Sequence, residues 1–289
     1  MTAPLRATTP EPVPGSRYGT AEDFDIEEFW SGIAAFLGGT ANVIMQLSLM
    51  PVAYGVLEST VESGKVTVHP WKRLRTTLTY LAVALMGTEE ERAAYRDAVN
   101  TSHRTIRSGA ESPVKYNAFD PNLQLWVAAC LYWGIVDLEE RLHGPLDEAD
   151  ADAFYQYAAR LGTTLQMRAE LWPADRAAFA EYWNANLATK TIDARTRAYF
   201  DGLIDLRMVA PPLRLFAPVQ RFIVTGLLPP HLRDEMGMRW TPRQDRALGL
   251  LLRAIGAVQR GLPQRLRLFP MNYYLWDLRR RRRLGKPLV

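Results

Sequence analysis

Residues 69–109 decide the fold of this chain, and they read HPWKRLRTTLTYLAVALMGTEEERAAYRDAVNTSHRTIRSG. Their apolar residues predict one helix over residues 71–86, closed at Gly87, and a second helix that begins after Thr88. Thr88 followed three residues later by Glu91 is a capping-box pattern, in which hydroxyl and carboxylate each bind a free backbone amide. The stretch therefore predicts two successive helices with a sharply defined boundary.

His103 lies late on the second of these helices, on one face with Val99 and Ile106. An apolar face should look inward, so a neutral imidazole there is either a satisfied core histidine or a metal ligand. No other ligand stands at the spacing of a protein metal site. Haem iron is the exception, because the porphyrin supplies four ligands and one protein imidazole is enough.

Three segments carry a resemblance: RLRTT at residues 73–77, VNTSH at 99–103 and YNAFDPNLQLWV at 116–127. In this order and spacing they resemble the b-type haem oxygenase family that includes the latex-clearing rubber oxygenases and the fungal MpaB-type oxygenases. The similarity covers about residues 29–240. It implies an all-α fold, a single helical domain with a globin-like core around haem b. It also implies oxidation, with O2, of a small apolar substrate that is isoprenoid-like or an aromatic secondary metabolite.

The resemblance also implies roles for single residues. His103 would be the proximal iron ligand. Arg73, Thr76 and Thr77 match the distal Arg-x-x-Lys-Thr pattern of the rubber oxygenases, with Thr76 in place of the lysine, so we expect these three to be the catalytic residues. A threonine hydroxyl is mainly a hydrogen-bonding group, so we expect water or nothing in the sixth iron position. The plain alternative is a solvated basic face shared with Lys72.

Two arginines beside His103 are candidates to bind the carboxylates of the cofactor. Haem carries two propionates, and an arginine fork pairs well with a carboxylate. Arg107, four residues after His103, is the first candidate and Arg104 the second. The alternative is that both are surface arginines that the dipole favours at a helix C-terminus.

The composition of the 289-residue chain allows a large core, since 48% of its residues are hydrophobic. The single cysteine, Cys130, excludes an internal disulfide and a thiolate cluster, and its apolar neighbours predict that it is buried. Residues 1–24 are polar and lack the apolar stretch of a secretory signal, so they predict a flexible arm and a cytoplasmic, possibly membrane-associated, protein. Exported rubber oxygenases differ in this respect, which argues against rubber as the substrate.

The remaining helices follow from periodicity and from Gly, Pro and capping residues. We expect a helix over residues 25–37 that Gly38 and Gly39 interrupt, and an apolar helix over 41–56, too short to be a transmembrane span and kinked or ended near Pro51. Asp120 and Pro121 open a central helix. Further helices are expected over residues 148–161, 173–187, 194–228 with a break at 211–212, and 242–260; no clear strand is visible.

Three further polar residues have plain interpretations. For Glu58, the preferred interpretation is a carboxylate at the end of a helix, and the alternative is a carboxylate on the distal side of a haem pocket. His143 ends the central helix and is expected to be exposed. His231 lies beside two prolines, so the preferred interpretation is a loop residue, and the alternative is a second candidate iron ligand.

The last 27 residues, 263–289, form a basic tail after a helical domain over residues 25–262. Eight of them are Lys or Arg and one is acidic, Asp277, whereas the whole chain carries only +4. Aromatic residues beside the arginines suit the surface of an anionic membrane. Phosphates of nucleic acid would suit the same charges, but no nucleic-acid-binding motif is recognised. A tail folded back on the domain is the third possibility.

The sequence leaves several function classes open. The first is a haem oxygenase whose reaction is dioxygenase cleavage, monooxygenation or peroxidase-like oxidation. The second is a non-catalytic helical protein that binds haem, a membrane or a partner, with His103 as a core residue in the case without haem. No acid–base or nucleophilic triad and no Gly-rich phosphate loop is visible, and the sequence sets no oligomeric state.

Overall fold

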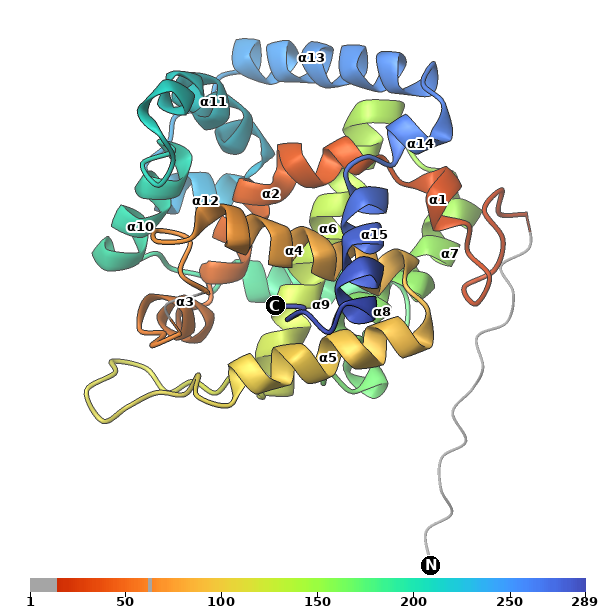
Figure 1. The fold of residues 1–289 in the computed structure, drawn as a ribbon. Helices are drawn as coiled ribbons and strands as arrows, with labels where there is room; N and C mark the ends of the chain where they lie inside the picture. Colours follow the sequence, from red (N-terminus) through yellow and green to blue (C-terminus); the bar gives the residue numbers. More distant parts are fainter. Residues whose placement is uncertain (1–14, 62–63) are drawn as a thin grey trace, which may run out of the picture.

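The computed structural model describes residues 15–61 and 64–289, and in this part of the chain the fold is all-α (Figure 1). The only β-type pairing there is an isolated bridge between Arg107 and Asn117. The first helices are α1 (Ile26–Phe29), α2 (Gly32–Leu47), α3 (Met50–Leu57), α4 (Pro70–Met86), α5 (Glu89–His103), α6 (Pro121–His143), α7 (Glu148–Ala158) and α8 (Arg160–Thr163). They are followed by η2 (Ala169–Leu171), α9 (Arg176–Leu187), α10 (Ala194–Ile204), η3 (Pro211–Phe216), α11 (Ala217–Leu227), α12 (Pro230–Glu235), α13 (Pro242–Arg260), α14 (Gln264–Arg267) and α15 (Met271–Arg283).

Helix α6 passes through the middle of the molecule and packs against α2, α8 and α13 (Figure 1). It begins where the sequence predicts, because the Asp120 carboxylate accepts the amide of Asn122 at 2.8 Å and Pro121 occupies the first turn. Most of its side chains are buried, including Cys130, which agrees with the sequence-based expectation. On α6, Trp126 and Trp133 each stack on Trp183 of α9, with ring centroids 5.3 and 5.2 Å apart.

The predicted break at Gly38 and Gly39 is wrong, because α2 runs through both glycines. A Cβ at Gly38 would stand 2.5 Å from Leu138 of α6, so this glycine allows the two helices to approach closely. The chain instead breaks before α2, at Trp30 and Ser31. The helix predicted over residues 41–56 is interrupted after Leu47, close to the kink or end expected near Pro51, and α3 starts with that proline in its first turn.

One bent pair of helices bears on whether the chain could cross a membrane. Within residues 15–61 and 64–289, no single helix combines the length and the apolar character needed to cross a bilayer. Helices α2 and α3 meet both criteria only as a pair, and that pair is bent by 107°.

The basic C-terminal segment forms α15, which lies along α4. Met271, Leu275 and Leu278 are buried in this contact. Several of its arginines meet carboxylates: Arg279 donates to Glu91 at 2.7 Å, and Arg281 donates to Asp277 at 2.7 Å. Of the three possibilities for this segment, folding back on the domain is therefore what the structure shows.

Candidate functional site

The site begins at the end of α5, whose start is fixed by its capping box. The Glu91 amide donates to the Thr88 hydroxyl at 3.2 Å, and the Thr88 amide donates to the Glu91 carboxylate at 3.0 Å, which confirms the sequence-based prediction. Tyr95 then ties α5 to α4, since its hydroxyl donates to the carbonyl of Thr76 at 2.6 Å. These contacts fix where α5 begins and how it lies on α4. His103 is the last residue of the helix, at the end opposite the capping box.

His103 is partly buried. Its Nδ1 atom is buried and has no hydrogen-bond partner among the described residues. Burial, together with the positive charge of Arg73, lowers the pKa of His103 to about 4. The imidazole is therefore neutral at pH 7, the form in which a ring nitrogen can bind a metal.

A second polar atom without a partner lies one turn earlier on the same helix. The Oδ1 atom of Asn100 is buried and accepts no hydrogen bond from the described residues. Residues three apart on a helix share a face, so Asn100 and His103 lie beside each other. Two such atoms together are unusual, because most buried polar groups in proteins are hydrogen-bonded.

The loop between α5 and α6 covers His103 with Phe119. The Ala118 amide donates to the Ile106 carbonyl at 3.0 Å, and the Ser108 amide donates to the Tyr116 carbonyl at 2.9 Å. These bonds fold the loop back on itself and bring the Phe119 ring to His103, with centroids 6.3 Å apart in an edge-on arrangement. The imidazole is therefore held against an apolar ring rather than a polar partner.

Arg73 of α4 is the predicted distal residue that the structure brings near His103. Its charge acts on His103, and it also opposes the burial that raises the pKa of Tyr95 in α5 and of Tyr199 in α10. Arg73 is exposed and makes no ion pair within the part of the chain that the structure covers. It is therefore a cation on α4 at the edge of the site, close enough to α5 and α10 for its charge to act on residues of both helices.

The two threonines of the same motif are placed differently. The Thr76 hydroxyl donates to the Arg73 carbonyl at 3.0 Å, so it is engaged with its own helix. Thr77 is partly buried, and its hydroxyl makes no hydrogen bond to any described residue. Thr77 is thus the threonine of the pair whose hydroxyl stays available.

Arg104 and Arg107 are exposed, and neither pairs with a carboxylate of the described residues. Helix α5 ends at His103, so the expectation that Ile106 shares a helical face with His103 is wrong, and Arg107 also lies beyond the helix. Arg107 lies instead in the bridge with Asn117. Both arginines nevertheless flank the segment that carries His103.

The other candidate polar residues have partners of their own. The Nε2 atom of His231 lies 2.7 Å from the carbonyl of Lys190, and Glu58 accepts the hydroxyl of Tyr116 at 2.9 Å. His143 is not exposed as predicted, because it is partly buried and its Nε2 atom lies 3.1 Å from the hydroxyl of Ser31. The Nδ1 atom of His143 is also buried without a hydrogen-bond partner among the described residues. His103 differs from His143 and His231 because neither of its ring nitrogens makes a hydrogen bond within this part of the chain.

No group of three or more His, Cys, Asp or Glu side chains in the described ranges could hold a metal ion. A single unengaged imidazole is therefore the metal-binding chemistry that these residues offer. Asn100, Phe119 and Tyr199 were not among the site residues expected from the sequence. Asn100 and Phe119 lie within the motifs quoted above, so a signal existed for them, but Tyr199 is far away in the sequence and no local pattern marks it.

Comparison with known proteins places the chain. Residues 27–260 match the family model described as "ER-bound oxygenase mpaB/B'/Rubber oxygenase, catalytic domain". The chain belongs to this family. It is also 52% identical over 250 residues to "Uncharacterized protein Rv2237" of Mycobacterium tuberculosis (strain ATCC 25618 / H37Rv), over 86% of this chain and 98% of that protein. The same values apply to "Uncharacterized protein Mb2261" of Mycobacterium bovis (strain ATCC BAA-935 / AF2122/97).

No solved structure matches the chain. Membership of the oxygenase family confirms the resemblance found in the sequence and makes the protein an oxidoreductase whose partners are O2 and a substrate. The family match includes α4, α5 and α6, the helices that carry the three motifs.

Proposed function

We propose that this protein is a haem b-dependent oxygenase with His103 as the proximal iron ligand and a small apolar molecule as substrate. The observation that supports it most is the buried, unpartnered Nδ1 atom of His103. A neutral imidazole with an unused ring nitrogen, inside a domain of an oxygenase family, fits the single protein ligand that haem requires. Haem, when bound, supplies the oxygen chemistry.

The residues around His103 have distinct roles in this proposal. Burial and the charge of Arg73 keep the imidazole neutral, so that it binds iron instead of a proton. Phe119 restricts the orientation of the ring and excludes water from it. Arg73 and Thr77 are hydrogen-bond donors for O2 or substrate, whereas Thr76 is engaged with its own helix and is the weaker candidate.

The two flanking arginines are the proposed partners of the haem propionates. Arg104 and Arg107 are cations without carboxylate partners among residues 15–61 and 64–289, on the segment that follows His103. A charge-assisted hydrogen bond to a propionate would engage each of them. A globin-like core around haem b follows from the same proposal.

The test is the ultraviolet–visible spectrum of the protein expressed with a haem precursor, beside His103→Ala and the matched control His231→Ala. We expect a strong Soret band in the wild type and in His231→Ala, and a lost or shifted band in His103→Ala. The control is apt because His231 already contacts a backbone carbonyl. A wild type that stays colourless and cannot be reconstituted with haemin would refute the proposal.

Turnover separates the oxygenase from a protein that only binds haem. Apolar alkenes and aromatic metabolites, supplied with O2 and a reductant, should be consumed by the wild type. If haem binds but no such substrate is oxidised, the non-catalytic alternative is favoured. A colourless protein would favour the helical interaction protein, and this distinguishes the alternatives from each other.

Peripheral membrane contact through the basic tail stays a prediction, and we extend it to a second surface. The α13–α14 face, defined as the exposed side of α13 and α14, carries apolar side chains and arginines, several of which make no ion pair with a described residue. Arg246, Arg253 and Arg260 follow each other at seven-residue spacing and so lie along one side of α13. An apolar stripe beside a row of cations suits anionic headgroups, whereas a second copy would oppose like charges.

A further inference from the structure

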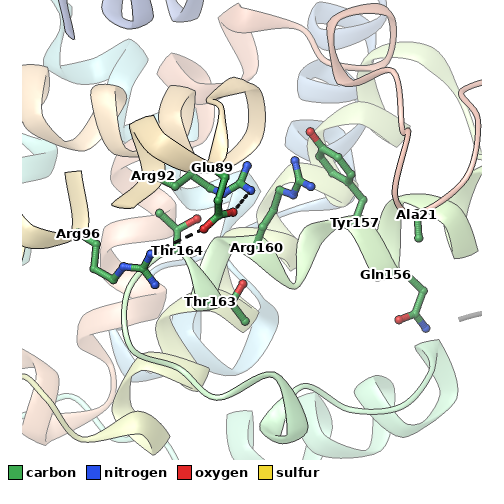
Figure 2. A pocket seen from close by; sticks show the side chains of 9 residues that line it. All are labelled: Ala21, Glu89, Arg92, Arg96, Gln156, Tyr157, Arg160, Thr163 and Thr164. Carbon is green, nitrogen blue, oxygen red and sulfur yellow. Dashed lines mark hydrogen bonds and ion pairs between the residues drawn. The ribbon is translucent and has the colours of Figure 1, made fainter. Parts of the chain in front are cut away.

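A pocket of about 330 Å³ lies at the start of α5, between that helix, the α7–α8 region and the segment around Ala21 (Figure 2). Helical geometry places it well away from His103. Arg92 and Arg96 precede His103 on α5 by eleven and seven residues, which at 1.5 Å per residue is roughly 10–17 Å along the axis. The pocket is therefore separate from the proposed haem site.

The lining of this pocket is strongly cationic. Arg92, Arg96 and Arg160 contribute three positive charges, and Glu89 contributes the only carboxylate in the lining. Figure 2 shows Arg92 and Arg96 converging on Glu89. Arg92 forms an ion pair with it, while the Arg96 nitrogen stays 3.8 Å from the carboxylate oxygen. The pocket thus has an excess of two positive charges.

Arg160 is the least compensated of the three arginines. It makes no ion pair with a carboxylate in the described part of the chain, and its guanidinium lies 3.8 Å from the centre of the Tyr157 ring. Burial lowers the pKa of Arg160, with Tyr157 acting against it and Arg92 adding to it. A partly buried cation without a counterion is costly, so its surroundings favour an incoming anion.

Two threonines add hydrogen-bonding groups to the lining. Thr163 and Thr164 follow Arg160 on and just after α8. Thr164 is 2% exposed, and its hydroxyl oxygen is buried without a partner among the described residues. The pocket therefore combines guanidinium groups with hydroxyl groups, which is the donor chemistry that binds phosphate oxygens.

We propose that this pocket binds a dianionic phosphate group, as free phosphate or as the phosphate of a small phosphomonoester. Its charge of about −2 matches the excess of two positive charges in the lining. The volume lies near the lower end of about 300–1,000 Å³ for small-molecule sites, which suits a small ligand. The bound anion links α5 to α8 through Arg96 and Arg160. The inference does not depend on haem.

The test is isothermal titration of the full-length protein with inorganic phosphate and, separately, methyl phosphate, at constant ionic strength set with sodium chloride. Arg160→Gln should weaken phosphate binding at least tenfold, and Glu89→Gln should tighten it, because the variant removes the only acid of the pocket. Arg168→Gln is the matched control, since Arg168 is exposed and does not line the pocket. It should bind as the wild type does.

The opposite outcomes are equally clear. Binding that is equal in all four proteins, or absent from the wild type, would overturn the proposal. If Arg160→Gln does not fold by circular dichroism, Arg96→Gln tests the same charge excess and should also weaken binding. Tighter binding of methyl phosphate than of inorganic phosphate would identify an ester as the ligand, and the reverse order would identify the free anion.

Discussion

Glu139 shows how packing changes the chemistry of a single side chain. It lies on α6 at 2% exposure, accepts the Ser31 amide at 3.0 Å, and stands 3.5 Å from the Nε2 atom of His143. Burial raises the pKa of Glu139 to about 8, although the Ser31 bond and the charge of Arg267 act against the rise. Burial also lowers the pKa of His143. At pH 7 both groups are therefore neutral, and their contact is not an ion pair.

This raised pKa predicts a pH dependence of stability that Glu139→Gln removes. Between about pH 4.3, the unfolded value of Glu, and about pH 8, the native state keeps a proton that the unfolded state has released. Stability therefore falls as the pH rises through this window. Between about pH 5 and about pH 8.5, we expect the free energy of unfolding of Glu139→Gln to fall by roughly 1–3 kcal/mol less than that of the wild type.

Urea unfolding followed by circular dichroism at both pH values measures this difference. Glu140→Gln is the matched control, because Glu140 is the exposed neighbour on the same helix. It should keep the wild-type pH dependence. Equal losses in the wild type and in Glu139→Gln would show that the carboxyl is already ionised in the native state.

At the scale of helices, the sequence predicted starts better than breaks. Thr88 and Asp120 each cap the helix that they were expected to open, because a cap depends on residues within one turn. The break at Ser31 depends on tertiary contacts instead. The Ser31 amide donates a hydrogen bond to the Glu139 carboxylate, and the next residue, Gly32, lies close to the carbonyl of Leu268. A local sequence pattern does not encode such contacts. Gly32 and Gly38 of α2 serve close packing instead, whereas Gly39 has open space around it.

Two glycines of α13 should respond in opposite directions to alanine. A Cβ at Gly256 would overlap the carbonyl oxygen of Leu142 on α6, so Gly256→Ala should destabilise the fold by about 1–3 kcal/mol. Gly249 meets only the flexible end of Arg253, 3.7 Å away, so Gly249→Ala should stabilise by about 0.5–1 kcal/mol. Thermal unfolding of the two variants measures both. A loss of stability in neither would mean that α13 does not pack on α6 as described.

The apolar residues of α13 are only partly covered by neighbouring helices. Leu248 and Leu252 are buried, whereas Leu251 and Val258 are exposed. Periodicity identifies the apolar side of a helix but not how much of that side a neighbour covers. The apolar side of α13 is wider than the surface that neighbouring helices cover, so the α13–α14 face stays apolar and exposed.

At the scale of the whole molecule, we expect binding to anionic vesicles through the α13–α14 face. Leu250 and Val258 are 64% and 67% exposed, so a Leu250→Glu, Val258→Glu variant should lose most co-sedimentation with phosphatidylglycerol vesicles without loss of fold. Phosphatidylcholine vesicles should bind neither protein. Arg283→Gln with Lys286→Gln tests the tail in the same assay, and a loss confined to that variant would assign the contact to the tail. Absence of wild-type binding would rule out both surfaces.

The candidate site was predictable only as far as its motifs reach. His103, Arg73 and the paired threonines came from short segments whose order resembles the family, and the family itself is confirmed. Their catalytic and ligand roles stay predictions. The proximity of Tyr199 on α10 to the charge of Arg73 was not predictable, because the two residues are far apart in the sequence. Spacing also misled for Ile106, since the helix ends at His103.

The packing of α15 on α4 has a consequence for synthesis on the ribosome. Arg75 in α4 donates to the carbonyl of Leu288 at 3.2 Å, so α4 is completed by a residue that is translated 213 positions later. Until α15 has emerged from the ribosome, the α4 surface that it covers stays open. A nascent chain that stalls before α15 therefore carries α4 and α5 but exposes apolar surface to chaperones and proteases. Loss of a short C-terminal segment should be as damaging to this enzyme as a change in its core.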